Sequence, residues 1–329
     1  MPVIDVHNHI VPAEFPPAPC DCMPDKWPSM RHHAGNKASV MIGGKEFRAV
    51  DHRCWDPARR AADMDAEEVD IQVLSPMPEL LSYWLDAKSG LAMARHINRA
   101  IAEMVAAAPT RFRGLGMVPL QDPDLAAKEL AVLRSDYGLL GIEIGSNING
   151  RVPGDPHFDA VFAEAERLGL AIFVHSLHPV ATDRLVGPPM LVPFVNFPID
   201  TGLAAISLIT GGTLARYPKL RIGFSHGGGT LAALLPRLNF GWQNMPALHG
   251  SFAAPVEAAR RFYYDNLVFE PAFCRYLIEA FGVSQLFVGS DYPFPAGRGR
   301  PRDFINQLGL SASDGEALRG GNASRFLGL

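Results

Sequence analysis

Residues 3–9 read Val-Ile-Asp-Val-His-Asn-His, a short apolar run that ends in two histidines separated by one residue. Such a run, rich in Val and Ile, is typical of a strand that is buried on both faces of a parallel sheet. Side chains at i and i+2 of a strand point to the same face. The run therefore predicts a buried first strand that brings His7 and His9 to one point near its end.

Seven further runs of this kind follow along the chain, at residues 70–75, 112–119, 140–145, 171–175, 220–226, 262–266 and 285–291. Helical patterns lie between them and after the last, at 57–68, 91–108, 122–135, 155–168, 199–217, 271–281, 303–308, 313–319 and 322–327. Three of these patterns begin at or beside Asp56, Asp122 and Asp155, which suit helix N-caps. Alternation of strand and helix around eight strands predicts a distorted (β/α)8 barrel as one domain, and a doubly wound open sheet is the alternative.

Residues 11–56 interrupt the alternation, with six prolines, three histidines and no long helical period. The stretch is too long for a simple connection between a strand and a helix. We therefore expect a small inserted subdomain over the mouth of the barrel. Within it, residues 39–50 around Gly43-Gly44 have the pattern of a hairpin.

Composition excludes several classes of protein. The chain has 329 residues, 48% of them hydrophobic and 19% charged, which excludes a disordered chain. A net charge of −4 with no basic stripe argues against a nucleic-acid partner. No run of 18 apolar residues and no basic leader is evident, so we expect no membrane span and a cytoplasmic location. Four cysteines are too few for a disulfide framework, and Cys20 and Cys22 are either ordinary thiols or two ligands of a metal.

Polar residues stand at the ends of three later strands: His175 at the fifth, His226 at the sixth and Asp291 at the eighth. Barrel active sites form at the carboxyl ends of the strands, so these residues are expected to meet His7 and His9 there. Three imidazoles and a carboxylate suit one Zn²⁺ per chain, and Mn²⁺ or Co²⁺ would also fit. A bound metal acidifies water, and His226 is well placed to take its proton.

Each of these residues has a structural alternative when it is taken alone. His175 would be an ordinary buried histidine, and Asp291 would cap the segment that follows it. His226 precedes Gly227-Gly228-Gly229, a turn whose backbone N–H groups would also suit an anion. The coincidence of all these residues at predicted strand ends favours the joint metal site.

Other histidines have weaker claims on the site. His178 lies three residues after His175, and we expect it to contact substrate from its loop. His32 and His33 lie in the insertion, where they would either line the mouth or face solvent.

Several motifs carry a resemblance to a known family: Asp-Val-His-Asn-His at 5–9, Val-His at 174–175, His-Gly-Gly-Gly at 226–229 and Gly-Ser-Asp-Tyr-Pro-Phe-Pro at 289–295. Shorter matches lie at 47–48, 54–57, 82–84, 111–116 and 321–323. By these motifs, which follow in order over nearly the whole chain, it resembles the amidohydrolase superfamily. Within the superfamily it is most similar to the metal-dependent decarboxylase branch that acts on aminocarboxymuconate semialdehyde.

The resemblance implies a zinc-dependent enzyme that releases CO2 from a small unsaturated carboxylate of aromatic-compound breakdown, without an organic cofactor. Zinc would be held by His7, His9, His175 and Asp291, with Asp291 also counted as catalytic. His226 would stand beside the metal-bound water as acid and base. Whether hydroxide adds to a substrate carbon or the carbon is simply protonated stays open.

Three further roles follow from the resemblance. Arg48 would grip a substrate carboxylate, a task that suits a guanidinium fork. Phe294 would pack over the substrate. Arg237 would reach into the site of a neighbouring copy, which implies a homodimer.

The chain departs from the family around the substrate. Residues 176–178 read Ser-Leu-His where the family has Pro-Trp-Asp, and 191–198 lacks the family's tryptophan. These changes leave the exact substrate open between a carboxylated ring-cleavage product and a hydroxybenzoate.

A metal-dependent hydrolase or hydratase is the alternative activity, since related sites split amides and esters or hydrate double bonds. The fourth strand lacks the lysine that bridges two metals in many hydrolases, which disfavours a two-metal site. In a two-metal site, Glu143 on the same strand would take the place of that lysine. A barrel that only binds a ligand is disfavoured, because no type of ligand residue is missing.

Overall fold

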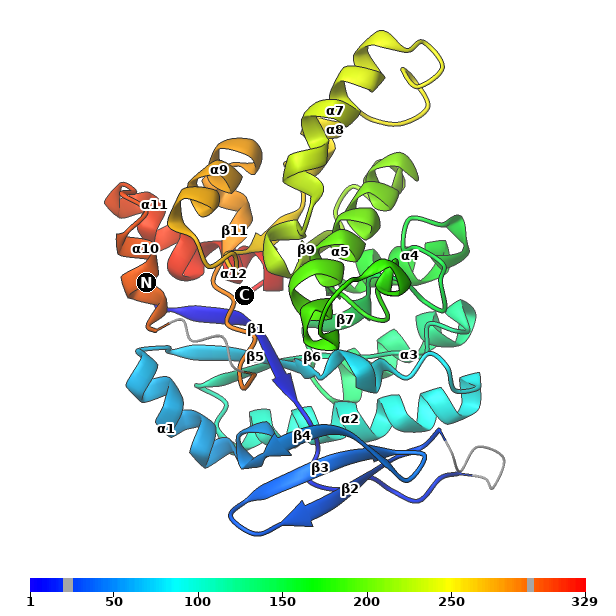
Figure 1. Cartoon of the computed structure of the whole chain (residues 1–329), viewed down its shortest axis with the longest axis vertical. Helices are drawn as coiled ribbons and strands as arrows, with labels where there is room; N and C mark the ends of the chain where they lie inside the picture. Colours follow the sequence, from blue (N-terminus) through cyan, green and yellow to red (C-terminus); the bar gives the residue numbers. More distant parts are fainter. Residues whose placement is uncertain (20–25, 295–298) are drawn as a thin grey trace.

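The computed structural model describes residues 1–19, 26–294 and 299–329, so Cys20 and Cys22 lie outside the described residues. In the described residues, eight parallel strands form one sheet in sequence order (Figure 1). They are β1 Ile4–Ile10, β5 Ile71–Pro76, β6 Phe112–Gly116, β7 Gly141–Gly145, β8 Ala171–His175, β9 Arg221–Phe224, β10 Tyr263–Asp265 and β11 Leu286–Phe287. The N–H of Val6 donates to the carbonyl of Val288 at 2.9 Å, which joins the last strand to the first. The predicted (β/α)8 barrel is confirmed.

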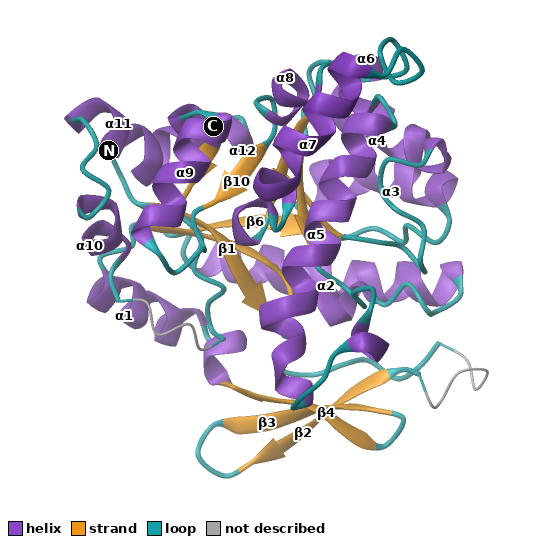
Figure 2. Ribbon diagram, turned by 45° about the horizontal axis from the view of Figure 1, so that its top comes forward, coloured by secondary structure: helices purple, strands orange, loops and turns teal. Residues whose placement is uncertain are grey.

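Helices surround the barrel (Figure 2). They are α1 Pro57–Glu67, α2 Ala87–Ala107, α3 Pro123–Asp136, α4 Asp159–Leu168, α5 Val192–Thr210, α6 Thr213–Arg216, α7 Leu231–Asn244, α8 Pro255–Ala259, α9 Pro271–Phe281, α10 Pro301–Asn306, α11 Ala312–Glu316 and α12 Asn322–Leu327. Asp56 accepts hydrogen bonds from the N–H groups of Ala58 and Arg59, and Asp122 accepts one from that of Leu125. These aspartates therefore cap α1 and α3 as the sequence predicts, because they satisfy N–H groups that lack partners within the helix.

The insertion after β1 holds an antiparallel three-stranded sheet of β2 Pro28–His33, β3 Lys37–Ile42 and β4 Lys45–Asp51. Figure 2 shows this sheet standing apart from the barrel strands. The turn between β3 and β4 is Gly43-Gly44, and both residues have positive φ, at 59° and 71°. The expected hairpin is present, and β2 extends it by a strand that the pattern did not indicate.

The structure also differs from the sequence prediction after β9 and at the end of β11. α7 and α8 follow β9 where no helix is predicted, since glycines precede α7 and Pro236 lies inside it. β11 ends at Phe287, although the predicted strand continues to Asp291. A Cβ on Gly289 would lie 2.7 Å from the Asp265 Cβ, so a larger residue would clash there, and the chain turns through Asp291 at φ 62°.

The segment Pro189–Thr210, which includes α5, is long and apolar enough to cross a membrane by length and composition alone. In the fold it contacts β8, and its Asp200 is buried against the side chains of Ser146 and Asn147. The segment is partly buried in the helical layer of the barrel, whereas its Phe194 and Leu203 are 69% and 41% exposed.

The opposite end of the barrel from the carboxyl ends of the strands is filled by apolar side chains. Phe326 of α12 packs on the rings of Tyr263 and Phe287, at 5.3 and 5.1 Å between centroids. This core fixes the strands and leaves their carboxyl ends to carry polar residues.

Candidate metal centre

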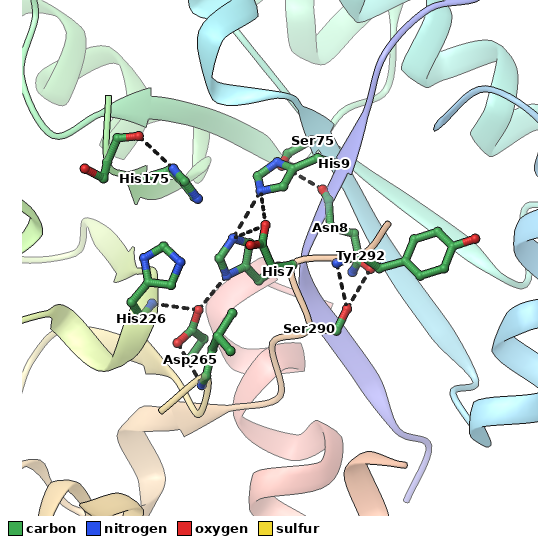
Figure 3. A network of polar contacts seen from close by, with 12 residues as sticks. His7, Asn8, His9, Ser75, His175, His226, Asp265, Ser290 and Tyr292 are labelled. Atoms are coloured by element: carbon green, nitrogen blue, oxygen red, sulfur yellow. Dashed lines mark hydrogen bonds and ion pairs between the residues drawn. The ribbon is translucent and has the colours of Figure 1, made fainter. Parts of the chain in front are cut away.

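The structure brings the four predicted ligands together at the carboxyl ends of the strands. His7 and His9 come from β1, His175 ends β8, and Asp291 lies in the turn that follows β11. One nitrogen or oxygen from each of the four lies within 4.8 Å of the others. Figure 3 shows the imidazoles of His7 and His9 on β1 and that of His175 at the end of β8 converging on one point. The i, i+2 spacing on β1 therefore delivers two rings to one point.

Each ligand histidine is held by a hydrogen bond at Nδ1. His7 Nδ1 lies 2.6 Å from Asp265 Oδ2, and His9 Nδ1 lies 2.9 Å from the Pro76 carbonyl. His175 Nδ1 lies 2.9 Å from the Ser176 carbonyl. Carbonyl and carboxylate oxygens accept, so each Nδ1 carries the proton and each Nε2 keeps its lone pair for a metal.

The Nε2 atoms face one another and Asp291. The Nε2 atoms of His7 and His9 are 3.1 Å apart, and His9 Nε2 lies 3.0 Å from Asp291 Oδ1. His175 Nε2 is buried, and none of the residues that the structure describes forms a hydrogen bond with it. Electron pairs that converge so closely repel unless a cation lies among them, so three nitrogens and one carboxylate oxygen fit a divalent metal of borderline softness.

The pKa shifts of Asp291 and His175 favour the forms that bind metal. For His9, burial lowers the pKa, but the nearby Glu143 and Asp291 outweigh it and raise the pKa. Burial of Asp291 opposes its charge, but the adjacent imidazoles of His9 and His7 outweigh this and hold its pKa well below the usual range. Burial, helped by His9 and His7, lowers the pKa of His175. At neutral pH the carboxylate is therefore charged and His175 is a neutral imidazole.

His226 lies beside the cluster without joining it. Its ring centroid is 5.2 Å from that of His7 and 5.1 Å from that of His175, and its buried Nδ1 has no hydrogen-bond partner within residues 1–19, 26–294 and 299–329. Burial first, and then His7, lowers the pKa of His226 to about 4. His226 is therefore neutral at physiological pH and able to accept a proton.

The glycine turn after His226 is occupied by internal hydrogen bonds. The N–H groups of His226 and Gly227 donate to Asp265 at 2.9 and 2.8 Å, and those of Gly228 and Gly229 donate to backbone carbonyls. These four N–H groups are therefore not free to bind an anion, which argues against the alternative of an anion site. A Cβ on Gly229 would lie 2.1 Å from the Pro198 carbonyl oxygen, which accounts for glycine there.

Asp265 is a site residue that the sequence reasoning missed. It ends β10, is fully buried, and accepts four hydrogen bonds, from His7 Nδ1 and the N–H groups of His226, Gly227 and Leu267. Burial alone would raise the pKa of Asp265, but the hydrogen bond with His7 and the other contacts together have the larger effect, so the pKa is lowered overall. Asp265 thus orients a metal ligand and the proposed base together. Its position at the end of a predicted strand was the signal that could have identified it.

Arg60 of α1 was also missed. Its buried guanidinium donates to the His9 carbonyl at 2.6 and 3.2 Å and lies 4.6 Å from the ring centroid of Tyr292. It thereby joins the backbone of one ligand to the residue that follows Asp291.

Glu143 does not join the ligand atoms. It is buried on β7, accepts from Ser75 Oγ at 2.5 Å, and lies 3.6 Å from His9 Nδ1. Burial raises its pKa to about 7. Because it faces the Nδ1 side of His9, the structure gives no support to Glu143 as a bridging ligand.

A cavity of about 510 Å³ opens above the metal ligands. Its wall is mostly apolar, with a few polar groups. The lining residues are His9, Arg48, Pro78, Glu79, His175, Met190, Pro193, Phe194, Phe197, Pro198, His226, Gly229, Leu267, Val268, Phe269, Phe273, Asp291 and Phe294. The predicted substrate contacts Arg48 and Phe294 are therefore in the cavity, and the segment that lacks the family's tryptophan supplies phenylalanines instead.

Other predicted contacts lie outside the cavity lining. His178 packs on Trp84 at 5.3 Å between ring centroids, and Arg237 lies exposed on α7. His32 and His33 bond within the insertion, to the Ala13 carbonyl and Ser39 Oγ. The substrate role of His178 and the intersubunit role of Arg237 stay predictions.

Comparison with known proteins points to one family. The family model described as "Amidohydrolase" matches residues 4–329. The chain is 38% identical over 330 residues to a 2-amino-3-carboxymuconate-6-semialdehyde decarboxylase of Dictyostelium discoideum, with 99% of this chain and 91% of the relative covered. A Caenorhabditis elegans protein of the same name is 26% identical, with 99% and 94% covered. The crystal structure of a 5-carboxyvanillate decarboxylase from Sphingomonas paucimobilis matches with a TM-score of 0.81 at 27% identity, covering 100% and 99%.

Proposed function

Because the chain belongs to the amidohydrolase family, we propose that it is a metal-dependent, non-oxidative decarboxylase. Its substrate is a small carboxylated muconate semialdehyde or a related aromatic acid. The observation that carries the proposal is the convergence of three Nε2 lone pairs and Asp291 at the floor of a mostly apolar cavity. The names of the relatives favour decarboxylation over hydrolysis or hydration.

The chain's own groups fit this reaction. The carbon–carbon bond to the carboxylate breaks, its electron pair stays on the substrate carbon, CO2 leaves, and a proton takes its place. A metal bound here supplies Lewis-acid stabilisation of the developing negative charge. His226, neutral and without a partner at Nδ1, takes up a proton in the cavity and delivers it to the vacated carbon. Phe197 and Phe294 suit a flat conjugated acid.

We propose zinc as the native metal, one ion per chain, since three imidazoles and a carboxylate form a common zinc set. Mn²⁺ and Co²⁺ compete for the same donors. Metal analysis of protein purified without added metal tests this choice, followed by activity after reconstitution with each ion. We expect the purified protein to contain one zinc ion per chain and to be fully active after reconstitution with Zn²⁺. Activity after reconstitution with Mn²⁺ but not with Zn²⁺ would contradict the proposal.

We also propose a homodimer in which Arg237 serves the neighbouring site. Figure 1 shows α7 projecting away from the barrel, and its Leu234 and Phe240 are 40% and 66% exposed. Hybrid dimers of His226→Ala and Arg237→Ala chains test this. If Arg237 acts in the partner's site, mixing two inactive variants restores one complete site per dimer. An unrestored mixture, or a monomer in solution, would contradict the proposal.

The reaction itself is tested with a panel of acids on metal-loaded protein. The panel holds aminocarboxymuconate semialdehyde, its positional isomers, dihydroxybenzoates and 5-carboxyvanillate. Release of CO2 together with the matching decarboxylated product is expected from one of them. Consumption of an acid without CO2 would instead favour hydration or hydrolysis.

A further inference from the structure

Two opposite charges face each other in the same cavity as the metal ligands. Arg48 of β4 donates from Nη2 to Oε1 of Glu79 at 2.5 Å, and Glu79 lies in the short turn Pro78–Leu81 after β5. Both residues line the cavity, with 35% and 15% of their side chains exposed. The proposed carboxylate grip therefore already has an acidic neighbour.

Arg48 keeps donors for a ligand despite this pair. Its Nε is buried and has no hydrogen-bond partner among the described residues. Its guanidinium carbon lies 5.0 Å from the ring centroid of Phe294, and the His9 ring lies 5.9 Å from the same ring. A substrate carboxylate that binds Arg48 therefore lies beside Glu79, and only the Phe294 ring separates it from the metal ligand His9.

Glu79 creates an electrostatic condition for such binding. A partly exposed ion pair contributes little to stability, so a substrate carboxylate can share the guanidinium. It then places a second negative charge next to Glu79 in a site that the substrate itself desolvates, and like charges there disfavour binding. An N–H or O–H of the substrate that donates to Glu79 removes this penalty.

Resting on the decarboxylase function above, we propose that Glu79 is a specificity-determining residue. It selects conjugated acids that carry an amino or hydroxyl group on the carbon next to the one bearing the carboxylate that Arg48 binds. The Arg48 Nε–H donates to the carboxylate, and a Glu79 oxygen accepts from the neighbouring amino or hydroxyl group. Acids with hydrogen or methyl at that position leave Glu79 facing a carboxylate and bind less well.

The test compares pairs of acids that differ only by amino or hydroxyl against hydrogen or methyl at that position. Wild type, Glu79→Gln and Glu79→Leu are measured for kcat/KM, and for Kd by calorimetry. Glu164→Gln is the matched control, since it removes a similar pair with Arg167, at 2.6 Å on α4. Bound metal and the thermal midpoint show that each variant is folded.

Wild type and the control are expected to prefer the donor-bearing acid by about 10–100-fold. The preference shrinks in Glu79→Gln and falls to about onefold in Glu79→Leu, which also binds the donor-free acid more tightly than wild type does. An unchanged preference in Glu79→Leu overturns the proposal. So does an equal loss for both acids, which would mean that Glu79 only positions Arg48. The Kd ratio decides the matter even if no acid releases CO2, an outcome that would count against the decarboxylase function alone.

Discussion

Replacing Asp265 by Asn tests the support behind the metal ligands. Oδ2 of Asp265 accepts from His7 Nδ1 at 2.6 Å and from the His226 N–H at 2.9 Å. Oδ1 accepts from the N–H groups of Gly227 and Leu267 at 2.8 and 3.0 Å. An amide turns one of these oxygens into a donor, so two of the four N–H groups lose their acceptor whichever way the side chain lies.

The size of the effect follows from these contacts. A buried donor without an acceptor costs about 1–3 kcal/mol, so two of them lower the free energy of unfolding by about 2–6 kcal/mol. Loss of the carboxylate behind a ligand histidine weakens metal binding about 10–100-fold, because His7 loses the negative charge that makes its Nε2 a better ligand.

The assay is competition for Zn²⁺ against a fluorescent chelator, combined with denaturant unfolding of the metal-free protein. Asp124→Asn, an exposed change on α3, is the matched control and should alter neither quantity. Metal affinity within twofold of wild type in a folded Asp265→Asn protein would refute the role given to Asp265.

Three further changes have definite expected outcomes. His226→Ala should keep one metal per chain but lose about 10²–10⁴-fold in kcat, since it removes the proton carrier and no ligand; full turnover would refute its role. Arg48→Lys should raise KM about tenfold or more with little change in bound metal, because an ammonium lacks the planar fork, and an unchanged KM would show that Arg48 does not bind the substrate. Asp86 caps α2, and hydrogen bonds from Ser89, with one from the Lys88 N–H, lower its pKa. Its stabilisation is therefore present above about pH 4 and lost as pH falls through the lowered pKa. Asp86→Ala should cost about 1 kcal/mol at pH 7 in denaturant unfolding, with the difference from wild type shrinking toward pH 3, and a difference independent of pH would contradict the assignment.

The sequence predicts most of the metal centre because strand geometry is local. The i, i+2 alternation places His7 and His9 on one face, and parallel strands bring His175 to the same end of the barrel. Asp291 is brought in differently from the prediction, by a turn after a two-residue strand rather than by the strand itself. The close approach of Gly289 to Asp265 beside this turn is a contact between distant segments.

The missed features depend on such distant contacts. Asp265 is recognisable as a strand-end acid, but its four donors belong to three separate stretches of chain. Glu79 lies in a turn with no pattern of its own, and its pairing with Arg48 spans 31 positions. α7 follows a glycine turn and holds Pro236, and these breaker residues hid the helix-forming run Leu-Ala-Ala-Leu-Leu with which it begins.

One measurement tests the central claim most directly. Metal-free protein is titrated with Zn²⁺ while bound metal and CO2 release from the best acid of the panel are measured on the same samples. Release should rise in proportion to bound metal and level off at one ion per chain, and a chelator should abolish it. Full CO2 release from metal-free protein, or no CO2 release from protein with one ion per chain, would contradict the account.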